Sequence, residues 1–182
     1  FMPDHGNIKD ATRPAWRSLG VNATIGAGTD RFPFPQRPQR VPPQTRYARS
    51  GNVSVAYQVS GTGPGDLLYC AGWLSHLELA WEQPDLARFF NRLASFSRLI
   101  RFDRRGMGLS DRDISATTTL EQRAEDIGAV LNAAKSPRTA ILAASEGCFM
   151  ATMFAATFPE RVSGLILYGG FARASWAPDY SW

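Results

Sequence analysis

Ser145 is the residue of this chain whose setting best suits covalent chemistry. It stands between an apolar run that begins at Thr139 and a helical pattern over residues 148–158. Ala143 lies two residues before it and Gly147 two residues after it. A serine between small residues at a strand-to-helix corner is typical of a nucleophile elbow, where strand and helix come too close for larger side chains. The usual pattern has glycine in place of Ala143, and a serine buried at a strand end is the alternative interpretation.

A serine hydroxyl is a weak nucleophile unless a base accepts its proton and an acid orients that base. The chain has two histidines, His5 and His76, and neither follows Ser145. We therefore predict that this chain alone has little or no turnover. For His76 we weigh two roles, a hydrogen-bonded loop residue and a residue that lines a substrate pocket.

Other candidate sites give weaker signals. The loop over residues 103–111 contains Gly106 and Gly108, but a third glycine and a Walker lysine are missing, which disfavours a nucleotide site. Cys70 and Cys148 have no metal-ligand spacing and stand in apolar surroundings, so we expect buried free thiols. We predict no cofactor and no metal site.

Composition limits the partners that we expect. The chain of 182 residues has 44% hydrophobic and 20% charged residues, which is typical of a soluble globular protein. A net charge of +4 without a basic run interleaved with aromatic residues disfavours nucleic acid as a partner. No apolar run approaches the roughly 20 residues that cross a bilayer, and no signal peptide is recognisable. We expect a cytoplasmic protein whose partner is a small-molecule substrate or ligand.

The chain divides into two parts by composition. Residues 1–44 are rich in proline, which lacks the N–H donor and fixes φ, so this part is predicted to be a flexible leader. A proline-rich docking peptide is the alternative for it. Residues 45–182 have the alternating texture of one folded domain.

Within this domain, strand and helix patterns alternate. We expect strands over residues 45–50, 53–60, 66–72, 98–103, 139–144 and 163–171, the last of them buried, and helices over residues 84–97 and 148–158. A third helix is predicted to begin with a capping box formed by Thr118 and Glu121 and to continue to Ala134. After an initial hairpin, this order predicts an α/β fold with a mostly parallel sheet and helices on both faces.

Four stretches together resemble the α/β-hydrolase fold family, in an order and spacing that fit it. They read CAGW, DRRGMGLSD, AASEG and FPERVSGLILYGG. The resemblance covers the chain from Thr45 to its end and leaves the leader outside. More narrowly, stretches such as GWLSHLELAWE and LYGGFAR look like a bacterial subgroup in which a hydrolase domain precedes an adenylate or guanylate cyclase domain.

The resemblance implies a role for three residues. Ser145 would be the nucleophile that attacks a small ester or related acyl compound. The backbone N–H groups of Glu146 and Trp73 would form the oxyanion hole. Arg104 and Asp111 would shape the loop over residues 103–111 through salt links and hydrogen bonds.

The resemblance also implies that parts are missing. The family order places an acid and then a histidine after the nucleophile, but this chain ends just past the sixth strand, so the domain is expected to be partial. Asp179 is interpreted as structural rather than as the acid. Leu165, Ile166 and Leu167 would then form an uncovered edge able to self-associate. A ligand-sensing module fused to a cyclase and an inactive fragment remain alternatives to a hydrolase.

Overall fold

The computed structural model describes residues 42–112, 119–173 and 175–180. All but the last three residues of the predicted leader lie outside these ranges, so the leader stays a prediction. No helix in the described ranges combines the length and the apolar character needed to cross a bilayer.

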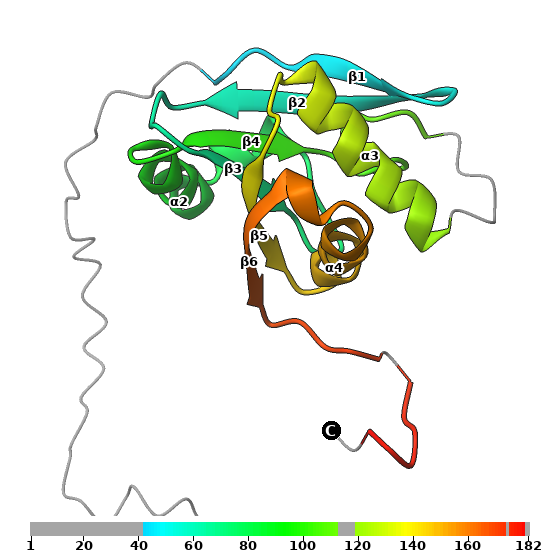
Figure 1. The fold of residues 1–182 in the computed structure, drawn as a ribbon. Helices are drawn as coiled ribbons and strands as arrows, with labels where there is room; N and C mark the ends of the chain where they lie inside the picture. The colour runs from blue at the N-terminus through cyan, green and yellow to red at the C-terminus, as the bar shows by residue number, and fades with distance from the viewer. Residues whose placement is uncertain (1–41, 113–118, 174, 181–182) are drawn as a thin grey trace, which may run out of the picture. The chain divides into compact units, whose positions relative to one another are not determined.

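The described part is built on one six-stranded sheet (Figure 1). Its strands are β1 (Arg46–Ser50), β2 (Val53–Ser60), β3 (Asp66–Cys70), β4 (Arg98–Phe102), β5 (Thr139–Ala144) and β6 (Val162–Tyr168). The spatial order is β1-β2-β4-β3-β5-β6. β1 and β2 form an antiparallel hairpin, β2 runs antiparallel to β4, and the remaining pairs are parallel. The predicted hairpin followed by a mostly parallel sheet is confirmed.

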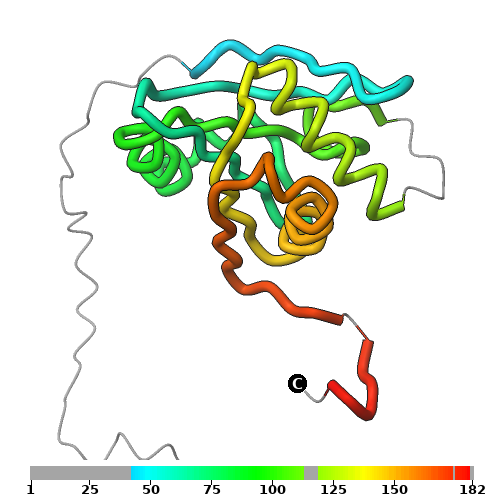
Figure 2. Tube along the Cα trace, in the orientation of Figure 1, coloured from blue at the N-terminus to red at the C-terminus, as the bar shows by residue number. Residues whose placement is uncertain are grey.

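Helices cover both faces of this sheet, as predicted. α2 (Pro84–Ala94) packs on one face, and α3 (Leu120–Ala133) and α4 (Gly147–Thr157) pack on the other (Figures 1 and 2). Two short elements were not predicted, namely α1 (Leu79–Glu82) and the 3₁₀ turn η2 (Pro159–Arg161).

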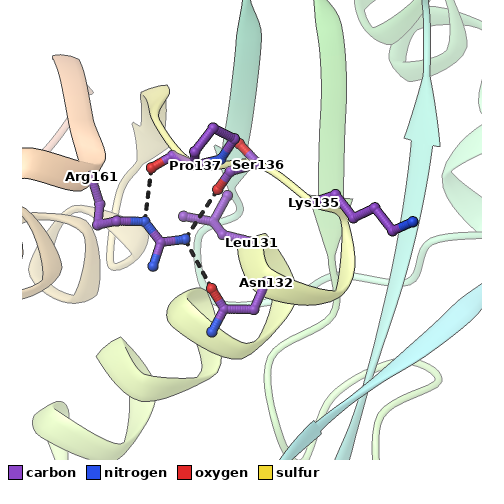
Figure 3. A pocket seen from close by; sticks show the side chains of 6 residues that line it. All are labelled: Leu131, Asn132, Lys135, Ser136, Pro137 and Arg161. Carbon is purple, nitrogen blue, oxygen red and sulfur yellow. Dashed lines mark hydrogen bonds between the residues drawn. The ribbon is translucent and has the colours of Figure 1, made fainter.

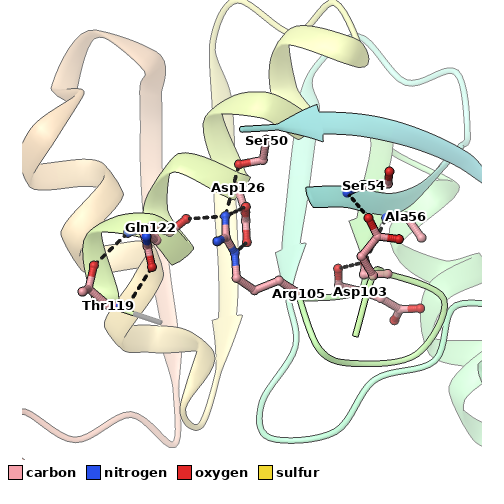
Figure 4. A network of polar contacts seen from close by, with 10 residues as sticks. Ser50, Ser54, Ala56, Asp103, Arg105, Thr119, Gln122 and Asp126 are labelled. Carbon is pink, nitrogen blue, oxygen red and sulfur yellow. Dashed lines mark hydrogen bonds and ion pairs between the residues drawn. The ribbon is translucent and has the colours of Figure 1, made fainter. Parts of the chain in front are cut away.

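Two predicted helix boundaries are wrong. α2 ends at Ala94 instead of residue 97, because the hydroxyls of Ser95 and Ser97 donate back to carbonyl oxygens of its last turn, at 2.7 and 2.8 Å. The capping box of α3 is formed by Thr119 and Gln122, one residue after the predicted pair (Figure 4). Threonine followed three residues later by Glu or Gln occurs twice in TTTLEQ, so the pattern alone does not decide between the two registers.

The core has two parts, one on each face of the sheet. The larger one lies under α3 and α4 and contains fully buried residues such as Leu68, Ile127 and Ile141. The smaller one lies under α2 around Phe90 and Leu99. β5 carries side chains into both, so the position of its C-terminal end is fixed from both faces.

β6 is the exception to this burial. Its continuous apolar sequence predicts a strand buried on both faces, but the structure leaves most of it exposed. Leu165, Ile166 and Leu167 are 37, 54 and 49% exposed. The strand is exposed because it pairs with β5 on one side only and lies at the edge of the sheet. The buried strand is therefore wrong, and the uncovered edge is confirmed for the described chain.

Candidate active site

Ser145 stands at the corner between β5 and α4. Its φ angle is 51°, in the left-handed region that non-glycine residues seldom adopt, and the residue is exposed. The start of α4 lies close against the end of β3, since a β-carbon added to Gly147 would lie 2.4 Å from the carbonyl oxygen of Ala71. Ala143 is completely buried. The tight corner with a strained serine is confirmed, and the alternative of a buried serine is wrong.

The turn that follows β3 lies directly against this corner. A β-carbon added to Gly72 would be 3.1 Å from the Cβ atom of Ser145 and 3.7 Å from its hydroxyl oxygen. Trp73 comes next in the chain. It is 68% exposed, so its indole is not part of the core. The chain region predicted to supply one oxyanion donor therefore neighbours the serine.

A buried arginine connects the two residues predicted to donate to the oxyanion. The Arg104 guanidinium donates to the carbonyl oxygen of Trp73 at 2.6 Å and pairs with the Glu146 carboxylate at 3.4 Å. Arg123 pairs with the same carboxylate at 3.2 Å. Glu146 is the N-cap residue of α4, at the end of the helix where the first backbone N–H groups have no acceptor within the helix. The predicted structural role of Arg104 is confirmed, and its contact with both residues is new.

Asp103 ties the turn after β3 to the loop after β4. Its carboxylate is fully buried and accepts hydrogen bonds from the N–H groups of Leu77 at 3.1 Å and Leu109 at 2.9 Å. A β-carbon on Gly108, whose φ is 50°, would collide with that carboxylate. Asp111 accepts from the N–H of Ser54 at 2.7 Å, which confirms its predicted structural role.

The same loop is fixed to α3 by an ion pair that the sequence did not reveal (Figure 4). Arg105 donates to both carboxylate oxygens of Asp126, at 2.8 and 2.6 Å. Asp126 is 1% exposed, and its hydrogen bond with Arg105 raises the pKa of that guanidinium. A bidentate pair of this kind holds the loop in one orientation.

His76 makes a local hydrogen bond and also lines a cavity. Its Nδ1 atom accepts from the N–H of Leu79 at 3.3 Å, which fits the predicted loop role. It also contributes to the wall of a cavity of about 440 Å³ that includes Gly72. Both interpretations of His76 therefore agree with the structure, and a contact with substrate stays a prediction.

The two cysteines and Asp179 are the remaining residues that the sequence singled out. Cys70 and Cys148 are buried free thiols, as predicted, and desolvation raises the pKa of each. No cluster of three metal-ligating side chains occurs among the described residues. Asp179 is exposed and pairs with Arg173 at 3.0 Å.

Comparisons with known proteins agree with this fold. The family model described as alpha/beta hydrolase fold matches residues 67–182. The RutD protein of Azorhizobium caulinodans, assigned as a carbamate hydrolase, is 30% identical over 134 residues, which are 70% of this chain and 45% of that protein.

Solved structures extend the comparison. A hydrolase from Pseudomonas aeruginosa PA01 is 25% identical with a TM-score of 0.63, over 74% of this chain and 48% of its own. The esterase RhEst1 from Rhodococcus sp. ECU1013 is 29% identical with a TM-score of 0.61, over 70% of this chain and 46% of its own. The chain spans less than half the length of the curated relatives that it matches.

Proposed function

Since the chain belongs to the alpha/beta hydrolase fold family, we propose that it carries the nucleophile and oxyanion hole of a serine hydrolase. The observation that supports this proposal most directly is the conformation of Ser145. The residue is exposed and is held with a φ of 51° where β5 meets α4. A strained and exposed serine at this corner is what nucleophilic attack on an acyl carbon requires.

The proposed substrate is a small ester or related acyl compound. Two relatives support this class, because one is assigned as a carbamate hydrolase and another is an esterase. The Ser145 oxygen attacks the carbonyl carbon, its proton passes to a base, and the backbone N–H groups of Glu146 and Trp73 stabilise the oxyanion. The leaving group then departs with a proton, and water releases the acyl group from the serine.

We propose that the described part of the chain does not supply the proton acceptor of this mechanism. No histidine follows Ser145 in the sequence. We therefore propose that the acid and the histidine come from outside this chain, and that the chain alone turns over esters at a negligible rate.

The proposal is tested by exposing the chain and a Ser145→Ala variant to a fluorophosphonate and mapping the labelled peptide by mass spectrometry. We expect slow labelling at Ser145 and none in the variant. Ser110→Ala serves as a control, since this serine is buried in the loop after β4. Labelling that survives Ser145→Ala would contradict the assignment of the nucleophile.

A ligand-sensing role beside a cyclase domain remains a prediction from the sequence resemblance. The relatives reported above are hydrolases, and no contact in the described part of the chain favours sensing over hydrolysis.

A further inference from the structure

A cavity beside the elbow is lined by apolar side chains and by a few polar ones. It is the cavity of about 440 Å³ to which His76 contributes, and it is formed by β3, β4, α1, α2 and the turn after β3. Leu74, Leu77, Leu86 and Phe90 give it apolar walls, whereas Arg101 brings a guanidinium group to it. A mostly apolar cavity of this size with a few polar groups is typical of small-molecule sites.

Arg101 is buried without a hydrogen-bonding partner for one end of its guanidinium. The residue is 5% exposed, and its Nη1 atom has no hydrogen bond to any described residue. Its guanidinium carbon lies 3.6 Å from the ring centroid of Phe90 and 5.1 Å from that of Trp81. Burial lowers the pKa of Arg101 to about 10, so the group is still positively charged at pH 7. A buried cation with an unused donor is costly unless an acceptor reaches it.

Two more polar atoms, on residues that line the same cavity, lack partners. The Ser75 hydroxyl oxygen and the Oδ1 atom of Asp103 are buried and have no hydrogen bond to the described part of the chain. Ser75 can donate to an anion, whereas the negative charge of Asp103 opposes one that carries two charges. The residues that line the cavity therefore include two donors without partners, on Arg101 and Ser75, beside one acceptor without a partner, on Asp103.

A second arginine shows what a satisfied guanidinium looks like in this molecule. Arg161 lies at an indentation of about 470 Å³ between the end of α3 and η2 (Figure 3). It donates to the carbonyl oxygens of Pro137 and Ser136, at 2.9 and 3.0 Å, and to the side-chain oxygen of Asn132 at 3.0 Å. The protein itself supplies its acceptors, so nothing there calls for a ligand.

We propose that the cavity beside the elbow binds a small monocarboxylate with an apolar tail. The carboxylate accepts from the Arg101 guanidinium and from the Ser75 hydroxyl, and the tail contacts Leu77 and Phe90. A planar guanidinium suits a carboxylate, which can accept two parallel hydrogen bonds. One arginine opposed by Asp103 favours a monoanion over a phosphate dianion. This is the same cavity in which His76 would contact a substrate, but carboxylate binding there does not require the Ser145 hydroxyl and can be tested apart from the proposed hydrolase function.

Calorimetric titration of the full 182-residue chain with hexanoate, hexanamide and hexyl phosphate tests the proposal. We expect hexanoate to bind at least about tenfold more tightly than the other two, since a lost charged hydrogen bond costs a factor of this order. Equal affinity for hexanamide, or no heat of binding with hexanoate, would overturn the carboxylate assignment. Tighter binding of hexyl phosphate would instead point to a phosphate site.

Substitutions locate the binding. Arg101→Met is expected to remove the preference for hexanoate over hexanamide, and Arg101→Lys to retain part of it. Arg88→Met is the matched control, because Arg88 is exposed on α2 and pairs only with Asp85 in the described structure. Unchanged hexanoate binding by Arg101→Met would refute the site.

Two measurements separate this inference from other effects. Ser145→Ala should bind hexanoate like the parent chain. The binding result therefore stands whether or not Ser145 proves to be a nucleophile. If Arg101→Met does not fold, thermal unfolding of the parent chain tests the proposal instead. Hexanoate is expected to raise the Tm of the parent chain more than hexanamide does. Equal shifts in Tm would contradict the proposal.

Discussion

At the scale of single residues, Ser145 carries backbone strain that its side chain does not explain. Only Lys135 shares a positive φ among the non-glycine residues that the structure describes. The strain persists because β5, α4 and the turn after β3 leave the corner no room to relax, as the close approach of Gly147 to Ala71 shows. Strain of this kind gathers at functional sites, where position matters more than stability.

This strain predicts that Ser145→Gly is a stabilising substitution. Glycine adopts a positive φ without steric cost, so the free energy of unfolding should rise by about 0.5–1 kcal/mol in urea denaturation. Ser145→Ala is the control, because alanine keeps the strain and should give no such gain. Equal stabilisation by both variants would show that loss of the hydroxyl, rather than the backbone angle, is responsible.

The sequence revealed some of these residues and hid others. Ser145 and Gly147 were predictable because their small neighbours and the change of period mark a corner. Arg101 was not predictable as a site residue, since it stands in the strand RLIRF among both apolar and charged residues. Which face of a strand lies under α2 and beside a cavity depends on packing between distant segments. An arginine flanked by apolar residues was the one signal available.

At the scale of elements, the order of strands and helices followed from hydrophobic periodicity and turn residues. α1 has only four residues, which is too short for a periodic pattern to show. The contacts of Arg104 were also beyond prediction, because they join the turn after β3, the loop after β4 and the start of α4. These three segments are far apart in the sequence and meet only at the C-terminal ends of parallel strands.

Arg104 is predicted to position the oxyanion donors rather than merely to stabilise the fold. Arg104→Met should lower the rate of fluorophosphonate labelling at Ser145 by about tenfold or more, since misplaced oxyanion donors cost at least this much. Arg123→Met is the matched control, as it also loses Glu146 but has no contact with Trp73. The two variants must be compared at equal folded fractions. Partial rescue by Arg104→Lys would support positioning, whereas equal losses in the Arg104 and Arg123 variants would contradict it.

At the scale of the whole molecule, β6 gives the described sheet an unpaired apolar edge. Its exposed side chains include Ile166 and Tyr168, which are 54 and 75% exposed. Exposed edge strands offer unpaired N–H and C=O groups to another chain. The sequence predicted this edge only through the resemblance to the hydrolase family, because the apolar run by itself indicated burial.

We therefore predict that this chain self-associates through β6. In sedimentation velocity, the average mass should rise with protein concentration, and Ile166→Lys should shift it toward the monomer because a charge on an edge opposes pairing. Phe96→Lys is the control, since Phe96 is 55% exposed but lies after the end of α2. A monomer at all concentrations, or equal effects of the two substitutions, would contradict the prediction.

We propose that Ser145 is a positioned nucleophile whose proton acceptor is absent from the described part of the chain. The most direct test is the rate of fluorophosphonate labelling at Ser145 measured against the concentration of added imidazole, which can stand in for a missing histidine. We expect slow labelling without imidazole and a rate at Ser145 alone that rises in proportion to the imidazole concentration. Rapid labelling without imidazole would show that the chain already holds a base, and labelling that imidazole does not accelerate would contradict the claim that only the base is absent.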